Sequence, residues 1–76
     1  MVNNELWNQF TNREIEILQL LAQGWSNRQI ADSLCITVRT VKFHTSNIYE
    51  KIRAKSRSEA TVWLWMHRVV QVLGDD

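Results

Sequence analysis

Four helix-start signals follow one another closely in this chain. Each begins with Ser or Thr, and most have Glu or Gln three residues later. That is the spacing of a capping box, in which both side chains satisfy free backbone N–H groups of the first turn. The signals are Thr11 with Glu14, Ser26 with Gln29, Thr37, and Ser56 with Glu59. The chain has no proline and only two glycines, which also favours helices. The sequence therefore predicts an all-α fold.

The expected helices are separated by short connections. Apolar residues recur at helical spacing, and Gly24 and Gly74 can end the first and last helix. The predicted helices cover 12–23, 27–34, a third that follows Thr37 and turns Val38, Val41, Ile48 and Ile52 inward, and 57–73. Only Cys35 and Ile36 lie between the second helix and Thr37. Helices joined by so short a turn cross at a steep angle, so we expect a helix-turn-helix unit.

The length of the chain limits it to one small domain. We assign this domain to residues 10–74 of the 76, after an N-terminal segment over 1–9. A single cysteine excludes an internal disulfide and fits no zinc-ligand spacing, so we expect no metal or cofactor and a reducing compartment. No uncharged apolar run reaches about 18 residues, and the N-terminus lacks a basic region followed by an apolar run. We therefore expect a cytoplasmic protein without a membrane span or signal peptide.

Positive charge is concentrated in the middle of the chain. Residues 37–57 hold six basic residues and one acidic residue, a net charge of +5, whereas 1–36 and 58–76 each carry −2. A basic patch between acidic flanks suits a polyanion. Taken alone, however, the charge is explained more simply by a solvated surface.

The outward side of the third helix combines hydrogen-bonding groups, positive charge and one aromatic ring. It carries Arg39, Thr40, Lys42, Phe43, Ser46, Asn47 and Lys51. In the major groove, Lys and Arg can donate to guanine O6 and N7, Ser and Thr can pair with several base edges, and Phe can pack on the thymine methyl group. From these residues alone, a DNA-reading helix and a solvated face remain open alternatives, because helix-turn-helix units also occur as packing motifs.

Four segments of the chain carry a recognisable pattern. They are TNREIEIL at 11–18, GWSNRQIA at 24–31, TVKFH at 40–44, and KI at 51–52 with SRSEA at 56–60. In order and spacing they resemble the LuxR/GerE-type helix-turn-helix domain of bacterial transcription regulators, over about residues 10–66. The resemblance implies a four-helix bundle-like domain with a recognition helix third and a dimerisation helix fourth. It also implies a sequence-specific DNA-binding regulator rather than an enzyme, associated with the nucleoid when bound.

The resemblance further implies which residues contact double-stranded DNA. The base contacts would be Arg39, Lys42, Phe43 and Ser46, and the phosphate contacts Ser26, Asn27, Thr40, Lys51, Lys55 and Arg57. The positively polarised start of the second helix suits phosphate, and such contacts orient a protein without reading sequence. Asn27 also fits as a simple turn or cap residue. Arg39 and Ser46 depart from the common pattern of the family, so the base preference does not carry over.

The fourth helix is more apolar than a single core requires. Its apolar residues cover about half of its circumference, whereas packing on one core needs an arc of about 100°. Because the family commonly dimerises through this helix, we expect a homodimer whose interface contains Val62, Trp65, Met66, Val69, Val72 and Leu73. A two-fold dimer predicts an inverted-repeat DNA site. Alternatively, Trp7, Phe10 and the N-terminal segment fold back over this surface.

Other chemistry-bearing residues fit structural roles better than catalysis. Glu14 and Glu16 point about 200° apart around a helix, so they cannot form a catalytic pair. For Arg13, Glu14 and Glu16 the resemblance implies a structural role, as a capping carboxylate with buried or semi-buried ion pairs. His44 is expected to pack or hydrogen-bond. Cys35 is expected to be a small buried hydrophobe in the turn, and a redox role would require exposure and a lowered thiol pKa.

Two further alternatives concern the whole protein. The Met1 start and the acidic Asp75-Asp76 end favour a complete single-domain regulator over a fragment of a larger one. RNA polymerase or another regulator is a candidate protein partner. In the alternative function, the chain is a protein-interaction module that uses its Trp-rich last helix to bind another regulator and has no specific DNA site.

Overall fold

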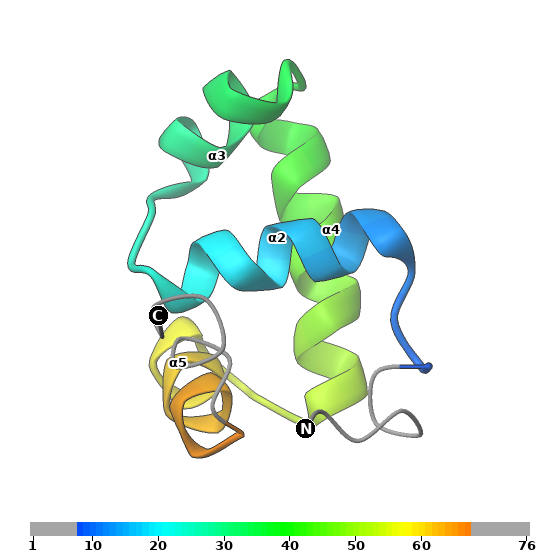
Figure 1. The fold of residues 1–76 in the computed structure, drawn as a ribbon, viewed down its shortest axis with the longest axis vertical. Helices are drawn as coiled ribbons and strands as arrows, with labels where there is room; N and C mark the ends of the chain where they lie inside the picture. Colours follow the sequence, from blue (N-terminus) through cyan, green and yellow to red (C-terminus); the bar gives the residue numbers. More distant parts are fainter. Residues whose placement is uncertain (1–7, 68–76) are drawn as a thin grey trace, which may run out of the picture.

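The computed structural model describes residues 8–67, and these form four helices. The helices are α2 (Asn12–Ala22), α3 (Asn27–Leu34), α4 (Val38–Ile52) and α5 (Arg57–Met66). In the part of the chain that the structure describes there is no strand, which agrees with the predicted all-α class. Helix α2 crosses α4, while α3 packs against the first turns of α4 and α5 lies near its end (Figure 1).

All four helices begin at the predicted N-caps. Each Ser or Thr hydroxyl accepts a hydrogen bond from the backbone N–H three residues later. The capping box is complete for α2, where the Thr11 N–H donates to Glu14 Oε1 at 2.9 Å, and for α3, where the Ser26 N–H donates to Gln29 Oε1 at 2.8 Å. At α5 the acidic side chain instead accepts from the N–H of Lys55. The helix starts were thus set by local hydrogen bonding.

The helix ends agree less closely with expectation. Helix α2 ends at Ala22 with Gln23 as its C-cap, and Gly24 then takes the expected left-handed conformation, with φ +87°. Helix α5 ends at Met66, so the expectation that His67 lies within the helix is wrong. His67 is the C-cap: its Nδ1 lies 2.8 Å from the Trp63 carbonyl oxygen, and its ring stacks on Trp63. The expected continuation over 68–73 and Gly74 lies outside the described residues.

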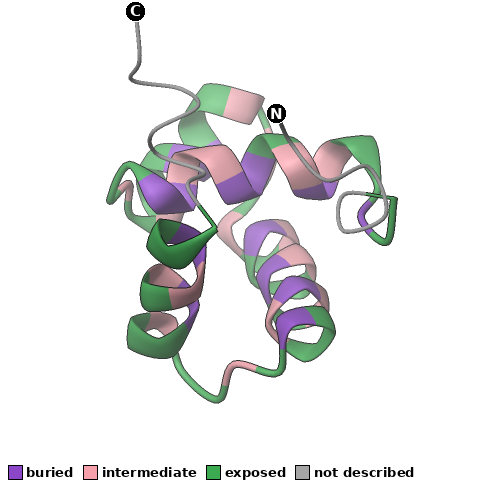
Figure 2. Ribbon diagram, turned by 60° about the horizontal axis from the view of Figure 1, so that its bottom comes forward, coloured by how far each residue is buried: buried purple, intermediate pink, exposed green. Residues whose placement is uncertain are grey.

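The core forms where the predicted apolar stripes meet. Figure 2 shows the buried residues of α2, α4 and α5 turned toward the centre of the domain. The largest fully buried side chains are Ile17, Leu18, Ile30, Val41, Ile48 and Leu64. Val38 and Leu34 are only half-buried and pack against the edge of this core. Because α4 buries one face here, its opposite face is left for other contacts.

Candidate nucleic-acid interface

The turn between α3 and α4 is held by hydrogen bonds back to α3. Cys35 is the C-cap of α3 with φ 59° and ψ 42°, and its N–H points to the carbonyls of Ala31 and Asp32. The Ile36 N–H donates to Ala31 O at 3.0 Å. These bonds close the expected helix-turn-helix. Cys35 is exposed, which corrects the expectation of a buried thiol: it occupies the left-handed cap position that glycine usually fills, while the next residue, Ile36, packs on the core.

Four side chains expected to contact bases lie together on the outer face of α4. Arg39, Lys42, Phe43 and Ser46 are all exposed, and their i, i+3, i+4, i+7 spacing forms one stripe. The opposite stripe contains the buried residues Val41, Thr45, Ile48 and Ile52. Phe43 is 64% exposed, so most of its large apolar ring faces solvent. The outer face of α4 is therefore free to meet a partner.

The residues expected to contact phosphate have more varied surroundings. Ser26 is exposed, but its hydroxyl already accepts from the Gln29 N–H. Thr40 is half-buried, and its hydroxyl lies 3.0 Å from that of the N-cap Thr37. Lys55 is exposed, and its side chain forms no ion pair with a described residue. Of these three side chains, that of Lys55 is the most readily available to an anion.

Arg57 bridges the first turn of α5 to the start of α3. Its Nη2 donates to the carbonyl oxygen of Trp25, and its Nη1 donates to Asn27 Oδ1 at 3.4 Å. Trp25 and Asn27 flank the N-cap of α3, so the guanidinium spans the connection that leads into this helix. Asn27 and Arg57 are both half-buried. The two residues expected to contact phosphate separately therefore contact each other.

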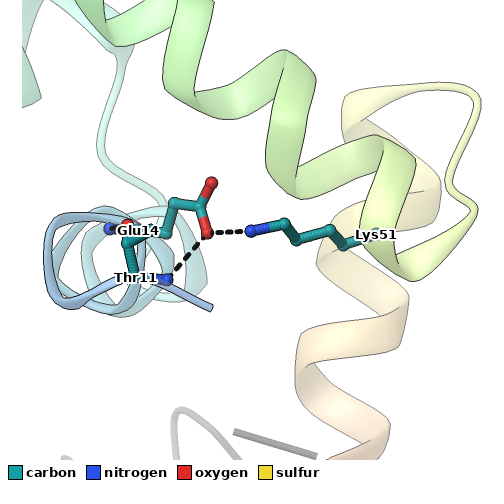
Figure 3. A network of polar contacts seen from close by, with 3 residues as sticks. All are labelled: Thr11, Glu14 and Lys51. Carbon is teal, nitrogen blue, oxygen red and sulfur yellow. Dashed lines mark hydrogen bonds and ion pairs between the residues drawn. The ribbon is translucent and has the colours of Figure 1, made fainter. Parts of the chain in front are cut away.

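Lys51 forms an ion pair with a buried carboxylate. Its Nζ lies 2.6 Å from Oε1 of Glu14, the oxygen that also accepts from the Thr11 N–H (Figure 3). The Glu14 side chain is only 4% exposed, and Lys51 Nζ also lies 5.8 Å from the centre of the Phe10 ring. The expected capping role of Glu14 is confirmed. Glu16 pairs with Arg13 at 3.1 Å, but this pair is exposed on α2 and not buried or semi-buried as expected, because both residues lie on the solvent side of the helix.

The pKa of Glu14 reflects these contacts. Burial raises the pKa of the carboxyl group, but the hydrogen bond from Lys51 and the backbone bond from Thr11 lower it, as do electrostatic interactions with Lys51 and His44. Together these interactions outweigh burial and hold the pKa of Glu14 below its usual range. Glu14 is therefore ionised at neutral pH, and the ammonium group of Lys51 compensates its buried negative charge.

The outer face of α5 is apolar. Val62 and Trp65 are each 57% exposed and Met66 is 74% exposed. Trp63 instead packs edge-on against the buried Phe10, one of the residues that the alternative placed over this helix, but Val62, Trp65 and Met66 are not covered. A groove of about 240 Å³ runs between the end of α4 and α5, with Val62 and Met66 among its lining residues. Trp7, Val69, Val72 and Leu73 lie outside the described residues.

Residues 8–67 contain neither a metal-binding cluster nor a membrane-spanning helix. Within that range no group of three or more His, Cys, Asp or Glu side chains is placed to hold a metal ion. No helix of that range has the length and apolar character needed to cross a membrane. His44 is half-buried with its ring edge-on to Phe43, which fits a packing role.

Comparison with known sequences then decides the family. The family described as "Bacterial regulatory proteins, luxR family" matches residues 8–64, which include all four described helices except the end of α5. The chain belongs to the luxR family. This membership confirms the resemblance drawn from the four sequence segments and supports a DNA-binding role in bacterial transcription regulation.

Similar full-length proteins are named response regulators. The luxR-family chain is 43% identical over 67 residues to response regulator protein VraR of Staphylococcus aureus, and equally so to the VraR proteins of Staphylococcus saprophyticus and Staphylococcus epidermidis. The alignment covers 88% of this chain but 32% of each relative. The chain thus spans about a third of the length of these curated relatives.

Sequence reasoning missed two long-range contacts within this luxR-family domain. It expected ion pairs for Glu14 but did not identify Lys51 as the partner, and it did not connect Arg57 with Trp25. The paired residues lie 37 and 32 positions apart. Helical spacing links residues three or four apart, as in Arg13 and Glu16, so no local signal announces either contact.

Proposed function

We propose that this luxR-family domain is a sequence-specific DNA-binding transcription regulator that inserts α4 into the major groove. The observation that carries the proposal is the exposed stripe of Arg39, Lys42, Phe43 and Ser46 on one face of α4. Its two cations suit guanine edges, its hydroxyl suits several bases, and its aromatic ring suits the thymine methyl group. The exposed Phe43 favours a base-reading face over a plain solvated one, because its ring adds an apolar contact for a base edge to this stripe.

Phosphate contacts would fix the orientation of α4 in the groove. In the proposal, Ser26 and Asn27 at the start of α3, Thr40 beside the stripe, and Lys55 after α4 contact the backbone of the DNA. The start of α3 is suited to this because its backbone N–H groups carry partial positive charge. Lys51 and Arg57 belong to the same expected set, but each has an intramolecular partner.

The proposal includes a two-fold homodimer formed through α5. The exposed Val62, Trp65 and Met66 support it, because they form a large apolar surface of residue types common in interface cores. Val69, Val72 and Leu73 would extend this interface. Two copies of α4 would then meet half-sites about 10 to 10.5 bp apart in an inverted repeat. Bound in this way, the protein would be part of the bacterial nucleoid.

Selection of duplexes from a random DNA pool at near-physiological salt tests the proposal. Purified protein should enrich an inverted repeat with half-sites about one helical turn apart. A repeat of this kind supports base reading, dimer symmetry and spacing together. Retention of duplexes without any enriched sequence, weakening as salt rises, would contradict base reading and indicate attraction to phosphate alone.

The apolar face of α5 favours one second candidate function. A protein-interaction module would dock another regulator or RNA polymerase on Val62, Trp65 and the adjoining groove. A flat pool together with a monomer in sedimentation equilibrium would favour this candidate, because a monomer leaves the α5 surface uncovered. An enriched inverted repeat with a dimer would exclude it as the main function.

A further inference from the structure

We propose that Lys51 and Arg57 are positioning residues that hold α3 and α4 in place for DNA, rather than phosphate ligands. The inference rests on the proposed function and divides the basic segment into two classes. Arg39, Lys42, Arg53 and Lys55 form no ion pair with a described residue, whereas Lys51 and Arg57 are engaged inside the domain.

Lys51 connects the last turn of α4 to the first turn of α2. Its ammonium group lies 2.6 Å from a carboxylate oxygen that is removed from solvent (Figure 3). If Lys51 turned away to bind phosphate, Glu14 would remain as an uncompensated buried charge, which is strongly unfavourable. One exposed phosphate contact offers much less in return, because water and salt screen it. Lys51 therefore stays with Glu14.

Arg57 connects the first turn of α5 to the start of α3. Its two terminal nitrogens donate to a backbone carbonyl and to a side-chain amide on either side of the Ser26 N-cap. A planar guanidinium can satisfy both acceptors at once, whereas a lysine ammonium is a single point donor on a flexible stem. The contact depends on the geometry of arginine and not on its charge alone.

Together the two contacts fix the positions of α3 and α4, the helices that face DNA in the proposal. Lys51 fixes the end of α4 opposite the α3 turn, and Arg57 fixes the start of α3, where Ser26 and Asn27 lie. The first turns of α4 are already joined to α3 by the short Cys35-Ile36 connection. Both ends of the recognition helix and the start of its companion are thus anchored. Loosening either anchor should weaken DNA binding without removing a DNA contact.

The salt dependence of binding distinguishes the two roles. Each phosphate contact contributes about 0.9 to the slope of log K against log salt, so losing one contact in each subunit of a dimer lowers the slope by about 1.8. Lys55→Gln is the control that should show this decrease. Glu14→Gln/Lys51→Gln removes the pair without changing net charge, and Arg57→Lys keeps the charge but loses the fork.

Both charge-conserving variants should bind the selected DNA roughly tenfold more weakly than wild type, with an unchanged salt slope, at a temperature where circular dichroism shows them folded. A slope lowered as much as by Lys55→Gln in the double variant would overturn the role of Lys51. Full affinity of Arg57→Lys would overturn the role of Arg57, because a phosphate ligand tolerates this change. Wild-type protein without salt-dependent binding would overturn the proposed function itself.

If the double variant does not fold, hydrogen–deuterium exchange of wild type with and without DNA replaces it. A positioning Lys51 should leave the exchange of the first turn of α2 unchanged on binding, since the ion pair persists. Faster exchange there in the complex would show that Lys51 has left Glu14, and would overturn the inference. For Arg57 the same comparison is made at the start of α3. Faster exchange there in the complex would show that Arg57 has left Trp25 and Asn27, and would overturn its positioning role.

Discussion

Lys42 and Lys51 lie on the same helix in opposite surroundings. Lys42 is exposed in the stripe with Arg39 and Phe43 and has no acidic partner among the described residues, whereas Lys51 is paired with the buried Glu14. By residue type and formal charge, the two lysines are identical. Their surroundings separate them, because a cation that neutralises a buried carboxylate belongs to the fold, while an unpaired cation on an exposed face is available to a partner.

The largest effect expected from this comparison is on stability. Lys51→Met should lower the free energy of unfolding by about 2 to 3 kcal/mol, since it leaves Glu14 buried and charged, with some relief because Lys51 is partly exposed. Urea unfolding measures the loss. Arg13→Met is the matched control, because it removes the cation from the exposed Arg13–Glu16 pair on α2, the helix that also carries Glu14. This change should cost about 0.5 kcal/mol or less. Equal losses of unfolding free energy in the two variants would show that the buried Glu14–Lys51 pair stabilises the fold no more than the exposed Arg13–Glu16 pair.

The next effect concerns DNA affinity. Lys42→Ala should leave unfolding within about 0.5 kcal/mol of wild type, because an exposed side chain without a partner is removed. Binding to the selected site should fall by about 1 to 3 kcal/mol, with relaxed preference at one base pair. Titration against duplexes altered at single positions checks this. A uniform loss on every duplex would assign Lys42 to phosphate.

Phe43 offers a smaller and more specific test within the same stripe. If its exposed ring packs on a thymine methyl group, replacing that thymine by uracil should weaken binding by about 0.8 kcal/mol, the value of one buried methylene. The same replacement should have no effect on Phe43→Ala protein. Uracil scanning of the selected site measures both. If no uracil substitution weakened binding by the wild-type protein, Phe43 would not contact a thymine methyl group.

The smallest effect is the acid response of the Glu14 pair. Because the pKa of Glu14 is lowered in the fold, its contribution to stability is present above the pKa of an unfolded glutamate, about 4.3, and is lost as pH falls through the lower folded value. Wild type should therefore lose more stability than Glu14→Gln/Lys51→Gln when acidified below about pH 4. Unfolding curves across this range test the difference. Parallel losses would mean that other carboxylates dominate acid unfolding.

Most of the fold was predictable because its signals are local. Thr11, Ser26, Thr37 and Ser56 each cap a helix through a backbone group three residues away, so the sequence pattern contains the whole interaction. The exposed stripe of α4 followed in the same way from helical spacing. Three of the interface residues expected on α5, Val62, Trp65 and Met66, are indeed exposed, although their role in a dimer stays a prediction.

The remaining features depend on contacts that no local pattern specifies. Lys51 was expected to contact phosphate because it lies in the basic segment, and only the folded chain brings it to Glu14. Cys35 was expected to be buried, but its left-handed backbone turns it outward. His67 was expected inside a helix that instead ends beside Trp63. For Lys51 tertiary packing determined the outcome, and for Cys35 a backbone conformation unusual for the residue type did, whereas His67 caps its helix through a local contact with Trp63 four residues earlier.

The separation of the two faces of α4 has an evolutionary consequence. Arg39, Lys42, Phe43 and Ser46 are exposed and lie outside the hydrophobic core, so a substitution at any of them changes folding stability little. The buried Val41, Thr45 and Ile48 on the opposite face have no such freedom. If α4 reads DNA as proposed, a lineage descended from this domain can therefore acquire new operator sequences one side chain at a time, with each intermediate still folded. In that case the scaffold stays constant while the set of DNA sites that it binds diverges.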